Sequence, residues 1–362
     1  MIKKILMSLI AFVAFFFFTT LSFAEEPLNT IEEARVLKIV ETKEINPQTK
    51  TPVRNVRVKL LTGSMKDKEF TVIDNIIRAP FQLKYKTGDK VVVTVSKTPG
   101  GTTGVYISDV DRKPMMLLLF AIFVLFTIVV SRWQGVTSLI GMAISFYVIA
   151  AFMIPNIFAG NDPFLMAVFS SLIILPATFY LAHGVNRKTN VAVISSFITL
   201  VFAGGLSYVF TELTKLTGMT TEEAVFLSST TGTTHIDIKN LLLAGILIGF
   251  LAIMDDITIS QASIVESLHK SNPRLTFKEL FDHAMAVGRD HVASLVNTLV
   301  LVYVGASFPL ILLFYNTQTS IGLVANQEII ATEIVRTLVG SIGIIAAVPV
   351  STYLACVFVK RN

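Results

Sequence analysis

The feature that most constrains this chain is a series of long apolar runs that begins after Pro114 and continues to the C-terminus. A helix needs about 20 apolar residues to cross the roughly 30 Å of hydrocarbon in a bilayer. Fifty-three per cent of all residues are hydrophobic and only 15% are charged, a balance that suits lipid better than water. Residues 114–362 are therefore expected to form an α-helical polytopic membrane bundle of about seven transmembrane helices. The stretches lie at residues 115–131, 133–154, 163–182, 190–210, 238–258, 292–314 and 334–359.

Residues 1–24 have the form of a secretory signal peptide. Lys3 and Lys4 precede an apolar stretch, and Ser22-Phe23-Ala24 supplies small residues at the positions that a signal peptidase reads. The apolar stretch is also long enough for an uncleaved anchor helix. In either case the segment that follows is expected outside the cytoplasm.

Residues 25–113 predict a small N-terminal all-β extracytoplasmic domain. In the segment 56–60, Val-Arg-Val-Lys-Leu, apolar and basic residues alternate as a half-buried strand requires. Turn residues such as Thr62-Gly63 and Thr87-Gly88 separate the β-branched runs. So many short strands favour a small barrel or sandwich, with an OB-like barrel as one form. The runs are Ala34–Glu41, Val53–Leu60, Lys68–Ile73, Lys90–Ser96 and Gly104–Val110.

Lys and Arg are unevenly distributed over the connections between the apolar stretches. Placing the β domain outside puts most of them in the cytoplasm, as the positive-inside rule predicts. The C-terminus is then cytoplasmic, and the chain crosses a bacterial cytoplasmic membrane several times. The cytoplasmic set is Arg132, Arg187, Lys188, Lys270, Arg274, Lys278, Arg289, Lys360 and Arg361. The outer set is Lys215, with Lys239 and Arg336 at helix edges.

The fifth stretch carries charge at both of its ends. Its uninterrupted apolar part, Leu241–Met254, rises only about 21 Å as a helix, which is too short to cross the hydrocarbon alone. Asp237 and Lys239 at one end, Asp255 and Asp256 at the other, or both pairs, must therefore approach or enter the membrane, where ionisable groups usually face a partner or a hydrated cavity. Alternatively, the two adjacent aspartates lie at the cytoplasmic interface and simply end the span.

A run of hydroxyl residues, 228–237, precedes this stretch. It could form a re-entrant loop or a broken helix, cap a helix, or be an ordinary polar loop. His235 and Asp237 alternate as metal ligands sometimes do, but two ligands are too few to define a metal site. Upstream, Thr220 and Glu223 have capping-box spacing and predict the start of a short helix.

A second capping box begins at Thr276 and predicts an amphipathic helix over residues 276–290 on the cytoplasmic surface, bending into the sixth stretch around Gly288. Arg289, Asp290 and His291 then lie at the membrane level of the paired aspartates. An ion pair from Arg289 to an aspartate fits this geometry, and so does a proton relay through His291. Asn297, deeper in the same stretch, is more typical of a hydrogen bond between helices than of a ligand site.

Several classes of function leave no trace in the sequence. It contains no metalloprotease, nucleophile-elbow, phosphate-loop or dinucleotide motif, so no catalytic residue and no cofactor is expected. The single cysteine, Cys356, offers neither a disulfide framework nor a metal cluster. The net charge of +5 is spread over loops with no basic-aromatic patch, which argues against nucleic acid.

Three ordered segments resemble the YibE/YibF family of bacterial membrane proteins. They are Met254–Ser263, Val287–His291 and Asn297–Leu301, the last followed by Gly305 and Pro309. The resemblance implies a multi-spanning membrane protein and, for its longer members, a signal with a β domain. It implies no particular activity.

Two functions of different classes follow from these observations. The first is a transporter or channel-like protein for a small solute or ion, with Asp255, Asp256 and residues 289–291 at the inner end of the pathway and residues 228–237 at the outer end. The second is a non-transporting assembly or sensory protein whose β domain binds an envelope partner. The lipid bilayer is the expected surrounding in both, and a homo-oligomer is compatible with either.

Overall fold

The computed structural model describes residues 29–45, 52–75, 83–97, 103–230, 236–315 and 320–360. The chain divides into two compact units, Met1–Phe126 and Thr127–Asn362. The predicted signal at residues 1–24 lies outside the described residues, as do residues 231–235 of the hydroxyl run.

The N-terminal unit is built on one five-stranded antiparallel sheet with the order β3-β2-β1-β4-β5. The edge strands β3 and β5 lie near each other, so the sheet curls into a half-barrel. All five predicted strands are confirmed. Their bounds are β1 (Asn29–Ile45), β2 (Pro52–Leu60), β3 (Glu69–Asn75), β4 (Lys90–Lys97) and β5 (Thr103–Val110).

The curvature of the sheet starts from β1, the longest strand. Its first part pairs with β4 and its later part with β2. The register with β2 shifts between Val36 and Lys38, and such a bulge bends and twists a strand. Alternate residues of β2 and β4 point inward and bury an aliphatic core, as the alternation over 56–60 predicts. The core members are Ala34, Val36, Val56, Val58, Leu60, Val72, Tyr85, Val91, Val93, Val95 and Val105.

A buried polar contact ties the segment before β4 to the sheet. Arg54 donates two hydrogen bonds to Asp74 across β2 and β3, and its guanidinium lies 4.4 Å from the centre of the Tyr85 ring. The Tyr85 hydroxyl also donates to Asp74. Burial and this carboxylate raise the pKa of Tyr85 well above its usual value. The turns at Gly63 and Gly88 need positive φ angles of 81° and 98°, which glycine adopts without strain.

The described helices account for every predicted apolar stretch. The first two stretches lie in α2 (Lys113–Val148), η1 (Ile149–Met153) and α3 (Ile154–Phe158). The next three correspond to α4 (Pro163–His183), α5 (Arg187–Leu213) and α7 (Ile238–Ser271). The last two correspond to α8 (Phe277–Ala306) with α9 (Phe308–Tyr315), and to α11 (Glu328–Lys360). Two short helices, α6 (Glu222–Thr230) and α10 (Ile321–Ala325), lie between them.

Among the described residues, five helices are long and apolar enough to cross a membrane, and six if the bent pair α8 and α9 is one span. The first of the five covers Lys113–Phe158, and it is interrupted at Arg132, whose backbone is not helical. The axes of α8 and α9 differ by 67°, at a break beside Pro309.

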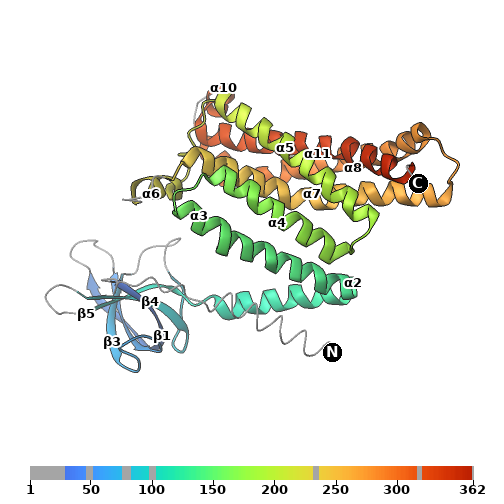
Figure 1. Ribbon diagram of the computed structural model, residues 1–362. Helices are drawn as coiled ribbons and strands as arrows, with labels where there is room; N and C mark the ends of the chain where they lie inside the picture. The colour runs from blue at the N-terminus through green and yellow to red at the C-terminus, as the bar shows by residue number, and fades with distance from the viewer. Residues whose placement is uncertain are drawn as a thin grey trace. The chain divides into compact units, whose positions relative to one another are not determined.

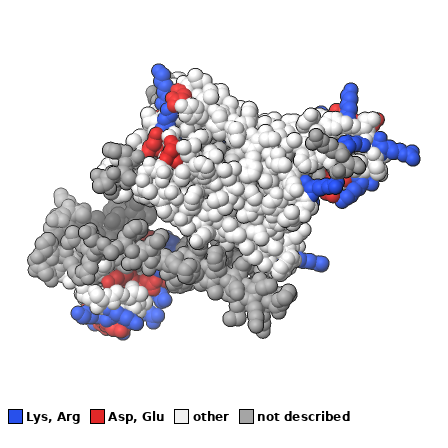
Figure 2. Space-filling view, viewed as in Figure 1, with Lys and Arg blue, Asp and Glu red and all other residues white. Residues whose placement is uncertain are grey.

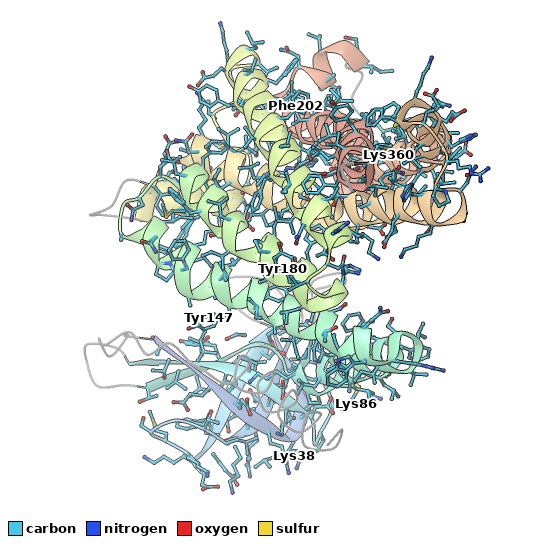
Figure 3. All side chains as sticks on the ribbon, turned by 45° about the vertical axis from the view of Figure 1, so that its right-hand side comes forward. Lys38, Lys86, Tyr147, Tyr180, Phe202 and Lys360 are labelled. Atoms are coloured by element: carbon cyan, nitrogen blue, oxygen red, sulfur yellow. The ribbon has the colours of Figure 1, made fainter. Side chains whose placement is uncertain are left out.

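Helix α7 lies at the centre of the second unit and contacts α4, α5, α8 and α11 (Figure 1). Large side chains from these helices fill the core, among them the fully buried Phe179, Leu247 and Met254. Figure 3 shows the side chains on these helices and labels Tyr180 on α4, the exposed Phe202 on α5 and Lys360 at the end of α11. Because α7 contacts four other helices, the surroundings of each of its side chains depend on which of those helices it faces.

The capping signals in the sequence place two helix starts. Thr276 forms the predicted capping box with Glu279 and begins α8. The cap of α6 is Thr221, one residue later than the predicted box: its hydroxyl accepts a hydrogen bond from the amide of Ala224. The expected bend at Gly288 is not found, because α8 continues unbroken to Ala306.

The charges of the helical unit gather at its two ends. Figure 2 shows Lys and Arg where α7 ends and α8 begins, a broad uncharged middle, and mixed charges at the opposite end. We name the first the basic end, defined by the connections at 184–187 and 271–277 and by Lys360. We name the other the acidic end, defined by the described residues 159–162, 214–230, 236–237 and 320–328. An apolar belt between two charged ends is what a bilayer requires.

Candidate functional site

The two adjacent aspartates lie inside α7 and do not end it. The helix continues beyond Asp256 to Ser271. Asp255 is half-buried, and its Oδ1 atom is fully buried with no hydrogen-bond partner among the described residues. The side chain of Asp256 is exposed. Adjacent helical residues differ by about 100° in direction, which allows Asp255 to face the neighbouring helices while Asp256 faces out.

Buried hydroxyls lie where α5 packs on α7, one of them on Thr258, three residues beyond Asp255. Ser196 and Thr258, on opposite helices, hydrogen bond at 3.0 Å, and both are fully buried. Thr258 also donates to the carbonyl of Met254, and Thr199 donates to the carbonyl of Ser195. The hydroxyl hydrogens of both threonines are thus directed at the backbone, which leaves oxygen lone pairs facing the interface.

The register between α5 and α7 places Thr199 at the level of Asp255. The two helices are antiparallel (Figure 1). Thr199, three residues after Ser196, therefore lies at the level of Asp255, three residues before Thr258. A second contact gives the same register further along, because a Cβ on Gly343 of α11 would touch both Ala203 and Phe250. By this register Asp255, Thr258, Ser196 and Thr199 lie within about one helical turn of one another along the two helices, and we name these four residues the hydroxyl–carboxylate cluster.

A third polar contact joins α7 to α11 and α8. The fully buried Gln261 accepts a hydrogen bond of 3.0 Å from Thr352, while its Nε2 atom has no partner in the described part of the chain. Gly288 lies directly against it: a Cβ there would be 3.1 Å from Nε2 and 2.6 Å from a methyl group of Val348. Gly288 thus permits α8 to approach α7 and α11 closely. Its role is in packing, and α8 remains continuous through it.

The remaining predicted residues of α8 do not join this group. Arg289, Asp290 and Asn297 are exposed, and His291 is half-buried. Within the described residues, no ion pair connects Arg289 to Asp255 or to its neighbour on α7. Gly288 packs against Gln261, about 9 Å beyond Asp255 along α7, and the next residue, Arg289, is exposed.

The acidic end holds a cavity of about 610 Å³. Charged and apolar side chains line it together: Glu212, Lys215, Leu216, Thr217, Met219, Ser228, Ile236, Asp237, Ile238 and Lys239. Lys239 forms an ion pair with Glu212, which ties α7 to α5. Asp237 caps α7, accepting a 3.0 Å hydrogen bond from the amide of Asn240. His235 lies outside the described residues.

Two further carboxylates at the acidic end accept hydrogen bonds from other segments of the chain. Glu328, at the start of α11, accepts hydrogen bonds from the amide and hydroxyl of Thr217 and from the amide of Gly218, at 2.5, 2.8 and 3.1 Å. Asp162, the cap of α4, accepts a 2.5 Å bond from Asn240 of α7. Among the described residues, these bonds connect the turn at Thr217 and Gly218 to α11, and α4 to α7.

The hydroxyl–carboxylate cluster, Gln261 and the cavity all lie within one continuous match to a family model. The family is described as YibE/F-like protein, and the match covers residues 119–361. This chain belongs to the YibE/F-like family. The apolar helices and the family together indicate a multi-spanning membrane protein. Comparison with curated proteins and with solved structures gives no match.

Sequence reasoning identified Asp255 but missed its neighbours. Asp255 and Thr258 are three residues apart, a spacing that places them on one side of α7, whereas Gln261 faces α8 and α11. The spacing of Asp255 and Thr258 can be read from the sequence. The partners cannot, because Ser196 is 62 residues from Thr258 and Thr352 is 91 residues from Gln261. No group of three or more His, Cys, Asp or Glu side chains able to hold a metal occurs among the described residues.

Proposed function

We propose that this YibE/F-like protein is a membrane transporter or channel-like protein for a small solute or ion. The observation that carries the proposal is the hydroxyl–carboxylate cluster around Asp255, buried where α5 packs on the central helix α7. The buried Oδ1 of Asp255, unpaired within the described chain, is its key atom.

The energetic cost of this arrangement supports a functional role. Burying a polar group without a hydrogen bond costs roughly 1–3 kcal/mol in proteins, and an unpaired carboxylate costs more. Packing alone would be served by apolar residues such as those around Phe179 and Leu247. Ionisable groups at membrane depth usually belong to solute or ion pathways, so the unpaired oxygen of Asp255 fits a group that a transported species contacts.

The positions along α7 are consistent with a path between the two ends. If α7 enters the hydrocarbon near Ile238, Asp255 lies about 26 Å further along, close to the far boundary of a roughly 30 Å layer. Gln261 follows after about another 9 Å. The cavity at the acidic end would form the outer mouth, and the cluster would form the inner part of the path.

The same proposal includes a specific topology. Lys113–Phe158 would rise about 69 Å as one straight helix, more than twice the hydrocarbon thickness, so Arg132 is taken as a turn between two spans. Counting α8 with α9 as one span gives seven in total. The basic end would face the cytoplasm, the β unit would lie outside as an OB-like barrel, and residues 1–24 would direct export in a bacterial cell.

Reporter fusions test this topology directly. Fusions after Asn186 and Ser271 are expected to report the cytoplasm, and a fusion after Gly160 the outside. A cytoplasmic signal from Gly160 would overturn the orientation, since that residue lies at the acidic end.

Flux measurements test the function. Purified protein would be placed in liposomes that contain fluorescent reporters for H⁺, Na⁺ and K⁺, with swelling recorded for uncharged solutes. Asp255→Asn is expected to reduce flux at least tenfold, because it removes the only charge in the cluster. Asp256→Asn, on the exposed side of the same helix turn, is the matched control and should keep most of the activity. Normal flux in Asp255→Asn would reject the assigned role.

One observation favours the alternative, an assembly or sensory protein. Ile31 and Tyr106 are 77% and 60% exposed, and they flank Thr94 of β4 in one row across the sheet. Exposed apolar side chains of this kind can bind a partner. A photo-reactive residue at position 106 of the full-length protein would test this. A single repeated crosslink to an envelope protein, with no flux for any probe, would favour the alternative.

A further inference from the structure

We propose that the hydroxyl–carboxylate cluster of Asp255, Thr258, Ser196 and Thr199 is a binding site for a monovalent alkali-metal cation. This inference rests on the proposed function, since it names the ion for the same carboxylate. It makes a separate claim, however, because binding can be measured without any transport.

The atoms of the cluster are the kind that hard cations prefer. Alkali and alkaline-earth cations bind carboxylate, hydroxyl and carbonyl oxygens. Asp255 supplies the carboxylate, and the three hydroxyls come from both sides of the α5–α7 interface. Gln261, the next buried polar residue on α7, faces α11 and α8 instead and contributes no ligand.

The hydrogen-bond pattern leaves the cluster with an excess of acceptors. Each hydroxyl has one hydrogen and two lone pairs. Thr258 uses its hydrogen on the carbonyl of Met254, so Ser196 must be the donor in the 3.0 Å bond between the two hydroxyls. Thr199 likewise uses its hydrogen on a backbone carbonyl. No hydroxyl hydrogen is then left for the buried Oδ1 of Asp255, which a cation would satisfy.

The charge of the cluster selects a monovalent ion. One carboxylate contributes a single negative charge, which one alkali cation neutralises. A divalent ion would leave a net positive charge in a buried site, and burial of unbalanced charge is strongly unfavourable. Divalent sites usually assemble several carboxylates, and the described residues contain no group of three acidic or other metal-ligating side chains.

Thermal unfolding of the full-length protein in detergent tests binding. Cys356 is the only cysteine and is buried, so a thiol-reactive fluorescent dye reports unfolding at one position. The unfolding temperature would be measured in NaCl, KCl, LiCl and choline chloride at equal ionic strength. We expect one alkali cation to raise it saturably, by about 5 °C near 100 times its dissociation constant, relative to choline.

Variants then assign the site. Asp255→Asn should abolish the shift, and Thr258→Val should weaken the affinity about tenfold, as the loss of one oxygen ligand does. Asp256→Asn should leave the shift unchanged. If Asp255→Asn fails to fold, Thr258→Val and Ser196→Ala decide the question, since both retain the carboxylate.

The outcomes separate this inference from the proposed function. A cation-specific shift lost in Asp255→Asn, together with no flux of any probe, would retain the cation site and reject the transporter. Flux without any alkali-specific shift in the wild type would reject the site, as would a shift that survives in Asp255→Asn. A response to pH alone, identical in all four salts, would show that Asp255 binds a proton only and would also reject the site.

Discussion

Gly343 gives the sharpest test of how the helical unit is packed. It lies on α11, where a Cβ would be 2.5 and 2.8 Å from two ring carbons of Phe250 and 3.1 Å from the Cβ of Ala203. Phe250 is 2% exposed, so its ring has little room to move. Gly343→Ala should therefore force α11 away from α5 and α7.

The magnitude of this effect follows from two opposing contributions. Overpacking a well-filled core costs about 1–3 kcal/mol. Replacing a helical glycine with alanine stabilises the helix by up to about 1 kcal/mol. The net loss is about 1–2 kcal/mol, which for a unit of this size lowers the unfolding temperature by about 2–8 °C.

Gly249→Ala provides the matched control. A Cβ on Gly249 meets no heavy atom within 4 Å in the described part of the chain, so only the helix gain remains and the unfolding temperature should stay constant or rise. The assay is the same dye reaction with Cys356. Gly343→Ala combined with Phe250→Leu should recover part of the loss, because the smaller side chain relieves the contact. Equal unfolding temperatures for the two alanine variants would refute the close packing of these helices.

Three further predictions concern other parts of the chain. Glu328→Ala should speed hydrogen exchange at the amide of Gly218 and its neighbours, because their acceptor is removed, while amides near the basic end stay protected. Thr276→Ala should cost about 1 kcal/mol through loss of the α8 cap, and Thr276→Ser should cost much less; equal losses would exclude capping as the cause. The β unit should lose stability as pH rises above about 10, because the pKa of Tyr85 is raised in the folded state and its ionisation is easier after unfolding. Tyr85→Phe should remove that part of the pH dependence, which circular dichroism can follow.

The elements of the chain were largely predictable, and the reason is periodicity. Alternating residues over 56–60 identified a strand with one buried face, and long apolar runs identified the helices. Local capping chemistry placed the start of α8 at the expected residue. Each of these signals is contained in a short window of sequence, so none required knowledge of a distant partner.

The candidate site was only partly predictable. Asp255 stood out because a carboxylate is costly within an apolar stretch. The described residues contain no ion pair between Arg289 and Asp255, because the start of α8 packs at the level of Gln261 and Arg289 is exposed. A sequence gives neither the register between two helices nor the direction of a side chain around the helix axis. One step along α8 turns the side chain by about 100°, and Gly288 takes the inward position.

The sequence by itself determined that this chain has a strand-rich segment followed by apolar helices with charge at their ends, since hydropathy and charge act residue by residue. Only the tertiary structure decided that α7 is the central helix, that Asp255 faces the core while Asp256 faces out, and that Ser196 and Thr258 meet. Those outcomes depend on which helices pack together and in what register. Packing of this kind is settled by close contacts between distant segments, such as Gly343 against Phe250, and no local pattern records them.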